Sequence, residues 1–167
     1  NAGLADPRVR GLCTDSLSDS DAIVRRTALA VLEEHSGPED LPLLALALDH
    51  LNDPDPDVRA RAISLLLRSG DFYYLTTAAG SLNEMLADSD PSLRALATSV
   101  LGEMGDPRVV RTLAPHLDDP SEKVRSATTL AVAAVASATA PPWVREITLE
   151  TARKALADPV EAVRLAA

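Results

Sequence analysis

The chain has 167 residues and a formal net charge of −9. Nucleic-acid affinity comes mainly from Lys and Arg side chains that neutralise phosphates, so this charge balance argues against a phosphate-binding surface. Apolar residues make up 46% of the chain but aromatic residues only 2%, which indicates packing by Ala and Leu between closely spaced helices. Cys13 is the only cysteine, so an intrachain disulfide is excluded and a reducing compartment is favoured.

One phrase recurs along the sequence: Leu, a turn rich in Asp and Pro, and then an apolar residue followed by Arg. Its arginines are Arg25, Arg59, Arg94, Arg125 and Arg164, spaced 34, 35, 31 and 39 residues apart. A period near 35 residues indicates stacked supersecondary units rather than one globular core. We expect units at about 18–51, 52–86, 87–117 and 118–156, with partial units at 1–17 and 157–167.

Each unit is predicted to be a pair of helices. Seven of the 12 prolines directly follow Asp, and Asp-Pro favours a helix start because Asp caps the first turn and Pro suits the first helical position. Asp119 to Glu122 and Asp158 to Glu161 add an acid at the expected third position, as in a capping box. Left-handed glycines are expected to end first helices at Gly37, Gly70 and Gly105.

The apolar spacing within each first helix is helical. The third residue after the recurring Arg is small and the seventh is larger, which makes a stripe that lets a neighbouring helix approach closely. These positions hold Ala28, Ala62, Ala97, Thr128 and Ala167, and then Leu32, Leu66, Leu101 and Val132.

Second helices are expected at about 6–17, 39–51, 72–86, 107–117 and 143–156. The first of these lacks a first helix before it, and residues 158–167 form a first helix without a second. We therefore expect the chain to be a fragment of a longer protein. The longest run of low charge, residues 126–140, is short and interrupted by Ser and Thr, so it predicts a buried helix rather than a membrane span.

At this point the residues resemble a known family. The stretch Val100-Leu-Gly-Glu-Met-Gly-Asp-Pro-Arg-Val-Val-Arg-Thr-Leu113, followed by Leu117-Asp-Asp-Pro and Val124-Arg125, is similar to HEAT-like repeats of the short bacterial form, as in phycobilisome-lyase-type repeats. The resemblance covers nearly the whole chain. It implies an all-α fold, a right-handed, armadillo-like α-solenoid of stacked antiparallel helix pairs.

The resemblance also implies a structural ladder between successive units. The five recurring arginines would pair with turn aspartates, namely Asp19 or Asp21, Asp53, Asp88, Asp118 and Asp158. Because a residue repeated in every unit usually serves stacking, we expect these arginines to be structural rather than a binding stripe. The second helices would line the concave surface, which is the family's usual binding face.

The sequence predicts no catalytic, cofactor or metal site. Asp53-Pro-Asp55-Pro-Asp57 looks like the start of a calcium loop, but the sixth position is Val58 rather than Gly and the twelfth is Ser64 rather than Glu. Two overlapping helix starts explain it better.

The three histidines are isolated in the sequence, and the chain has one cysteine. His35, His50 and His116 have no His, Cys or acidic residue at a metal-site spacing, so a zinc centre is not expected. Cys13 has no neighbour that marks a nucleophile, and we expect a small buried residue there.

Aromatic residues gather at the starts of second helices. We expect burial for Phe72 and Trp143 and exposure for Tyr73, which falls on one helical face with Gly80. In the later second helices Val110, Leu113, Leu117, Val144, Ile147, Thr151 and Ala155 are expected to point inward. The remaining positions predict a partner-binding set of Tyr73, Thr77, Glu84, Arg108, Arg111, His116, Glu146, Glu150 and Arg153.

The favoured function is a non-catalytic, cytoplasmic scaffold that presents its concave surface to a protein or peptide. One alternative is a cytosolic regulatory module of a transporter-like membrane protein, since Ser69 through Leu86 is similar to HEAT regions of nucleotide-transporter-like membrane proteins. A nucleic-acid or DNA-repair role, as in HEAT-like glycosylases, would need a basic concave face, which the acidic chain disfavours. A bilin-lyase-like activity rests on repeat resemblance alone.

Overall fold

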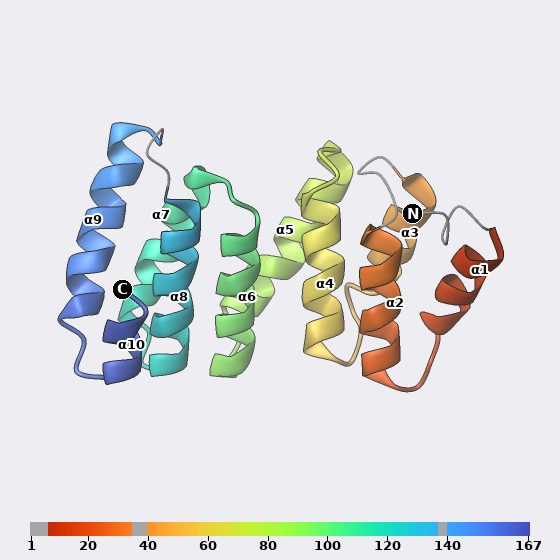
Figure 1. The fold of residues 1–167 in the computed structure, drawn as a ribbon, viewed down its shortest axis with the longest axis horizontal. Helices are drawn as coiled ribbons and strands as arrows, with labels where there is room; N and C mark the ends of the chain where they lie inside the picture. Colours follow the sequence, from red (N-terminus) through yellow and green to blue (C-terminus); the bar gives the residue numbers. More distant parts are fainter. Residues whose placement is uncertain (1–6, 35–39, 137–139) are drawn as a thin grey trace. The chain divides into compact units, whose positions relative to one another are not determined.

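The computed structural model describes residues 7–34, 40–136 and 140–167. Every regular element in these ranges is a helix (Figure 1). The chain divides into two compact units, Asn1–Leu82 and Asn83–Ala167, and the boundary falls inside one helix. His35 and the helix stop expected at Gly37 lie outside the described residues.

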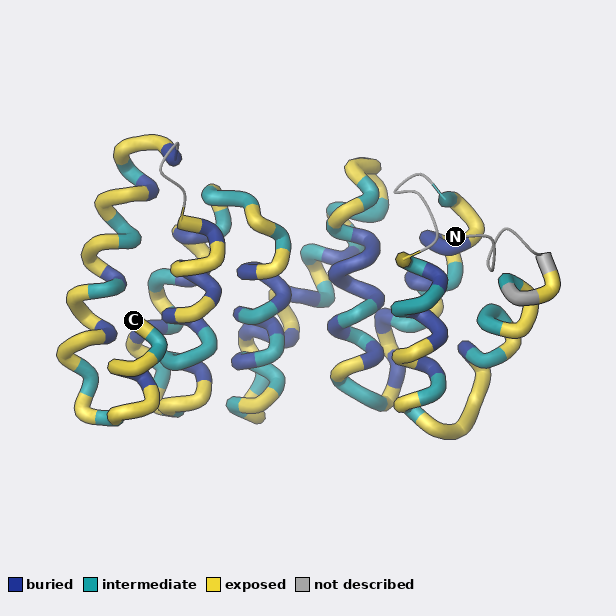
Figure 2. The backbone as a smooth tube through the Cα atoms, viewed as in Figure 1, coloured by how far each residue is buried: buried dark blue, intermediate teal, exposed yellow. Residues whose placement is uncertain are grey.

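Unit 1 contains α1 (Pro7–Ser16), α2 (Ala22–Glu34), α3 (Leu41–Asp49), α4 (Pro56–Leu67) and the first part of α5 (Phe72–Leu86). The first helices α2 and α4 pack against each other, α1 packs on α2, and α3 packs on α4 and α2. Figure 2 shows α4 buried along much of its length. The unit is thus a stack of antiparallel helix pairs in which first helices touch first helices.

Unit 2 repeats this arrangement. It holds α6 (Pro91–Glu103), the short helices η1 (Pro107–Val109), α7 (Val110–Leu113) and η2 (Ala114–Asp118), then α8 (Glu122–Val135), α9 (Pro142–Leu156) and α10 (Glu161–Leu165). The first helices α6, α8 and α10 form one row, because α8 contacts both of the others. The second helices form another row, because α9 contacts α7 and η2.

The helices lie close to the expected ranges, but one second helix is not a continuous α-helix. The second helix expected at 107–117 is a 3₁₀ turn, one α-turn and another 3₁₀ segment. Pro115 explains the break, since proline has no N–H to donate to the carbonyl four residues earlier and its ring crowds that carbonyl.

Asp-Pro pairs have two different roles. Asp55, Asp90 and Asp106 cap α4, α6 and η1, with the following Pro in the first helical turn, as expected. The capping boxes expected from Asp119 and Asp158 are wrong, because α8 and α10 begin only at Glu122 and Glu161. The two aspartates lie in the preceding turn, where their carboxylates accept the backbone N–H of Ser121 and Val160.

Glycine ends two of the first helices. Gly70 follows α4 with a φ of 74° and Gly105 follows α6 with a φ of 65°. Left-handed backbone of this kind strains residues that carry a Cβ. The predicted stop signals are confirmed at these two positions.

The core consists of the predicted small and large apolar positions. Of the small positions, Ala28, Ala62, Ala97 and Thr128 are buried, whereas Ala167 is exposed. All four larger positions, Leu32, Leu66, Leu101 and Val132, are buried. Helices α6 and α8 approach closely at Gly102, where an added Cβ would lie 2.8 Å from the Cα of Ala131. Only glycine fits there without a shift of one helix.

Candidate functional site

Within the described part of the chain, five turns between helices share one geometry. In each, an Asp carboxylate accepts the backbone N–H two residues later, at positions 19, 53, 88, 119 and 158. An Arg six residues after that Asp donates through Nη1 to the carbonyl oxygens of the Asp and of the next residue. The recurring arginine therefore holds its own turn closed.

Three of these arginines also reach into the following turn. Arg25 donates through Nε and Nη2 to Asp53, at 2.8 and 2.6 Å. Arg94 pairs with Asp119 at 2.8 Å through the same two nitrogens, and Arg125 pairs with Asp158 at 2.7 and 3.1 Å. Such two-point pairs fix the direction of the side chain as well as its charge.

The ladder differs from the predicted one at Asp118. Asp119, not Asp118, is the acceptor of Arg94, and Asp118 pairs with Lys154 instead. The six-residue distance from Asp to Arg selects Asp119, and it also selects Asp19 over Asp21. A rung between Arg59 and Asp88 would join the two units, and it stays a prediction.

The electrostatics of the ladder agree with a structural role. Hydrogen bonds from Arg25, Arg94 and Arg125 hold the pKa of Asp53, Asp119 and Asp158, respectively, below the usual value of an Asp. The carboxylates therefore stay ionised at neutral pH and stay bound to their arginines. Neither partner of a rung is available to a ligand.

The calcium reading of residues 53–57 has no support in the geometry. Asp53 binds Arg25, Asp55 caps α4, and Asp57 pairs with Arg26. The three carboxylates thus serve three different neighbours. Among the residues that the structure describes, no three His, Cys, Asp or Glu side chains form a group that could hold a metal ion.

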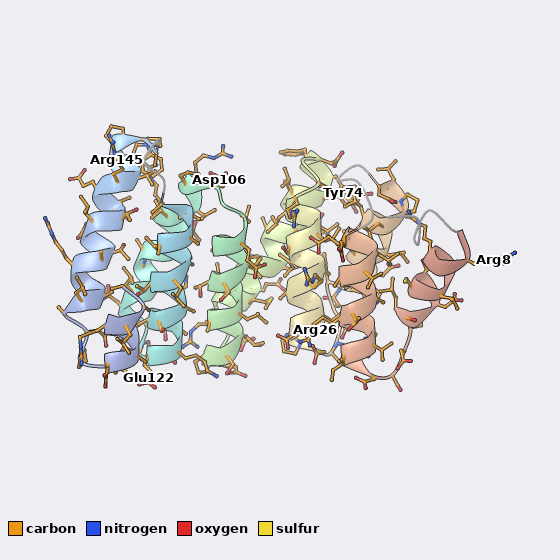
Figure 3. All side chains as sticks on the ribbon, viewed as in Figure 1. Arg8, Arg26, Tyr74, Asp106, Glu122 and Arg145 are labelled. Carbon is orange, nitrogen blue, oxygen red and sulfur yellow. The ribbon has the colours of Figure 1, made fainter. Side chains whose placement is uncertain are left out.

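The second-helix surface of unit 2 carries most of the predicted partner-binding residues. Val110, Leu113 and Leu117 are buried, as predicted, and this leaves Arg108 and Arg111 exposed with His116 half-buried. Burial lowers the pKa of His116, so its ring favours the neutral form. Figure 3 places Asp106 and Arg145 at one end of the unit and Glu122 at the other, as expected for antiparallel helix pairs.

The charged side chains of this surface are not equivalent. Arg108 is tied to Asp106, the cap of its own turn, at 2.6 Å. Arg111 instead lies over the indole ring of Trp143, with its Cζ 4.1 Å from the ring centroid. This cation–π contact joins α7 to α9 and holds both side chains in one orientation. Trp143 is half-buried, which is less than the burial predicted for it.

On α9 the inward positions are largely those predicted. Val144, Thr151 and Ala155 are buried and Ile147 is half-buried. The expected outward residues Glu146, Glu150 and Arg153 are exposed. They share the outer side of the helix with Leu149.

The aromatic residues of α5 lie at the start of that helix in unit 1. Tyr73 is 62% exposed, as predicted, and its ring meets Tyr74 edge-to-face at 5.4 Å. Thr77 is half-buried and donates its hydroxyl to the Tyr73 carbonyl oxygen. Phe72 is 80% exposed, so the predicted burial is wrong. Glu84, exposed, falls in unit 2.

Cys13 and His50 fill different roles from those of a reactive site. Cys13 is half-buried, which is less than the burial predicted for it. The ring nitrogens of His50 lie 2.8 Å from the Leu46 carbonyl oxygen and 3.0 Å from that of Leu17. His50 thus links α3 to the end of α1. The described helices include none long and apolar enough to cross a membrane.

Stacked helix pairs joined by a repeated Asp–Arg turn define an α-solenoid repeat protein. The family model for HEAT repeats matches residues 44–133, more than half of the chain. The chain therefore belongs to the HEAT repeat family, and the predicted all-α solenoid class is confirmed. A comparison with curated proteins finds no significant match.

Similar solved structures include three of different origin. An engineered protein is 14% identical, with a TM-score of 0.54, and the match covers 94% of this chain and 75% of that one. A designed armadillo repeat protein in complex with the peptide (KR)4 is 16% identical, with a TM-score of 0.55 and coverage of 98% and 80%. Human deoxyhypusine hydroxylase in complex with glycerol is 22% identical, with a TM-score of 0.56 and coverage of 99% and 62%. These likenesses show the fold.

Proposed function

We propose that the chain is a non-catalytic HEAT-repeat scaffold that binds a protein or peptide partner with its second helices. The observation that carries the proposal is the exposed Arg111 stacked on Trp143, beside Glu146 and Glu150. Aromatic and Arg side chains held in one orientation supply most of the energy of protein interfaces. The predicted cytoplasmic location belongs to the same proposal.

The first-helix surface of unit 1 offers a contrast. Its arginines are bound to acids on the neighbouring first helix, since Arg26 pairs with Asp57, and both Arg61 and Arg68 pair with Glu33. Charges that are already paired across the stack have less to gain from a partner. The second-helix surface of unit 2, where several charges have no ion pair with another described residue, is the better binding face.

The complex of the designed armadillo protein with a peptide supports a peptide partner, because that protein shares the fold. The hydroxylase shows that the same fold also occurs in an enzyme. No feature of the described surface favours the transporter-module or the nucleic-acid alternative over a protein partner.

The proposal predicts which substitutions weaken binding. The chain is immobilised, proteins captured from a lysate of the source cells are quantified, and the captured partner is titrated against variants. Tyr73→Ala and Arg111→Ala should each weaken binding by about 1–3 kcal/mol, since each removes an exposed anchor without opening the core. Far-UV circular dichroism checks that both variants remain folded.

Arg26→Glu and Arg61→Glu serve as controls on the first-helix surface. If binding survives both Tyr73→Ala and Arg111→Ala and is abolished by the two first-helix changes, the interface lies on the first-helix surface. That result would contradict the proposal.

A further inference from the structure

Arg111 has hydrogen-bond donors that no other described residue uses. The Cζ of its guanidinium lies over the Trp143 ring, 4.1 Å from the ring centroid. A guanidinium stacked on an aromatic ring keeps its N–H groups directed outward in its own plane, where a carboxylate can meet two of them at once. No carboxylate of the described residues is hydrogen-bonded to Arg111.

Two other cations at the ends of this surface are already paired with acids. Arg108 is bound to Asp106, and Lys154 is bound to Asp118. These two ion pairs lie toward opposite ends of the surface formed by α7, η2 and α9. Arg111 lies between them and is the candidate anchor for an anion.

The start of α9 adds to the preference for an anion at this end. Its N-cap is Pro141, which makes no side-chain cap bond to the first turn. The first backbone N–H groups of a helix carry partial positive charge, and nearby anions are stabilised. Trp143, on this first turn, therefore brings Arg111 and the positive end of α9 together.

The next two turns of α9 favour a cation instead. Glu146 and Glu150 lie three and seven residues after Trp143, so they follow it along one face of the helix. Both are exposed, and neither forms an ion pair or hydrogen bond with another described residue. Like charges four residues apart on a helix repel each other. The exposed Arg153, three residues after Glu150, relieves part of this repulsion, and a cation from a partner would relieve more of it.

We propose that the α7–α9 face, defined by Arg111, Trp143, Glu146 and Glu150, binds an extended partner segment that carries both an acidic and a basic residue. The acid pairs with Arg111 at the start of α9, and the base lies between Glu146 and Glu150. This inference rests on the proposed scaffold function and adds the chemistry of the partner to it.

The helix geometry sets the spacing of the two charges. Residues 143 to 150 rise about 10 Å along α9 at roughly 1.5 Å per residue. An extended chain covers about 3.3 Å per residue, so the acid and the base are about two to four residues apart in the partner. A segment with charge of one sign only satisfies one end of the face and is repelled at the other.

A selection from random dodecapeptides on the complete chain tests this inference. Peptides retained by the chain are then challenged with the Arg111→Ala/Glu146→Gln/Glu150→Gln variant, and those that bind it equally well are discarded. We expect the remaining peptides to share an acid and a base at the stated spacing. Trp143 is the only tryptophan of the chain, so its fluorescence reports binding of each synthetic peptide at this face.

Separate variants at the two ends of the face then show which charge of the peptide each end binds. Arg111→Ala and the pair Glu146→Gln/Glu150→Gln should each weaken the selected peptide about tenfold or more. The matched control, Glu122→Gln/Glu161→Gln, removes the same charge at the starts of the first helices α8 and α10, and it should change affinity less than about twofold. Arg111→Glu should regain affinity for a peptide whose acid is replaced by Lys.

The outcomes separate this inference from the scaffold proposal. Selected peptides of one charge sign, or a control pair that weakens binding as much as the test pair, overturn the mixed-charge partner. If such peptides still depend on Trp143, the scaffold proposal stands. Selected peptides that depend on Arg26 and Arg61 instead, or a selection without enrichment, overturn both.

Discussion

At three of the ladder turns a single arginine side chain bonds to two parts of the chain. In Arg25 the Nη1 nitrogen holds the carbonyl oxygens of its own turn, and the Nε and Nη2 nitrogens hold the carboxylate of Asp53. Lysine has one nitrogen and could not maintain both sets of bonds. The identity of this residue is therefore fixed by the number and direction of its donors rather than by charge alone.

The first prediction follows from the burial of this pair. Arg25→Ala should lower the Tm clearly more than Arg26→Ala, because Arg25 and Asp53 are buried while Arg26 and Asp57 are exposed. Removing Arg25 leaves a buried carboxylate without its cation, and exposed pairs contribute little. Differential scanning calorimetry measures both variants. Equal shifts in Tm would mean that the ladder adds no more than a surface ion pair.

Among the described elements, the first helices hold more of the buried apolar residues than the second helices do. Leu66 on α4 and Leu101 on α6 are buried against neighbouring helices. Leu66→Ala and Leu101→Ala should each reduce the free energy of unfolding by about 2–5 kcal/mol, through lost contacts and the cavity left behind. Urea denaturation measures the change, with the exposed Glu122→Gln as the control. If either Leu variant behaves like the control, the inner face is wrongly assigned.

The approach of α6 to α8 gives a sharper prediction. Gly102→Ala should destabilise the chain by about 1–3 kcal/mol, because the new methyl group would meet Ala131 and push two packed helices apart. At Gly80, where an added Cβ meets nothing within 4 Å, the same substitution removes a flexible residue from a helix and should be neutral or stabilising. A loss of stability at Gly80 as large as that at Gly102 would contradict this account.

Most helix positions could be predicted from the sequence, because caps, prolines and apolar spacing are local signals. Two roles of Asp-Pro could not be separated by those signals. Asp90-Pro91 starts a helix, whereas Asp119-Pro120 precedes one and supplies a ladder carboxylate. The six-residue distance to the next Arg distinguishes them. Pro115 was visible in the sequence, and its break in the second helix follows from its missing N–H.

The surface was less predictable, since exposure depends on neighbours that are distant in sequence. Phe72 is a large apolar residue of the kind usually found in a core, yet at the start of α5 it is exposed. Arg111 and Trp143 are 32 residues apart, and no local pattern indicates that they touch. Helical periodicity did identify the inward and outward sides of α9, because that alternation is a property of one helix alone.

For the whole molecule, acid should reduce stability in two stages. Burial lowers the pKa of His116 in the folded chain, so the unfolded chain takes up this proton first. Asp119 opposes the shift and Arg94 adds to it. The contribution of His116 is thus present above about pH 6.5 and is lost as the pH falls below that value.

The ladder carboxylates define the second stage. The pKa of Asp53, Asp119 and Asp158 is lowered by their arginines, so their contribution is present above about pH 4 and is lost as the pH falls through the folded values. We expect the Tm to fall in both windows between pH 8 and pH 3. His116→Gln should remove the upper fall and keep the lower one. A Tm that is constant from pH 8 to pH 5 in the unsubstituted chain would contradict the role of His116.

The bonds of a ladder arginine to its own turn and to the following turn also affect how such an array can be lengthened. A duplicated stretch that runs from the middle of one second helix to the middle of the next carries one turn Asp and its Arg six residues later. Inserted in register, its Asp meets the Arg of the preceding turn, and its Arg meets the Asp of the following turn. Gene duplication can thus lengthen the protein without a compensating mutation in the ladder, whereas a breakpoint inside the turn would separate the Arg from the carbonyl oxygens that it holds.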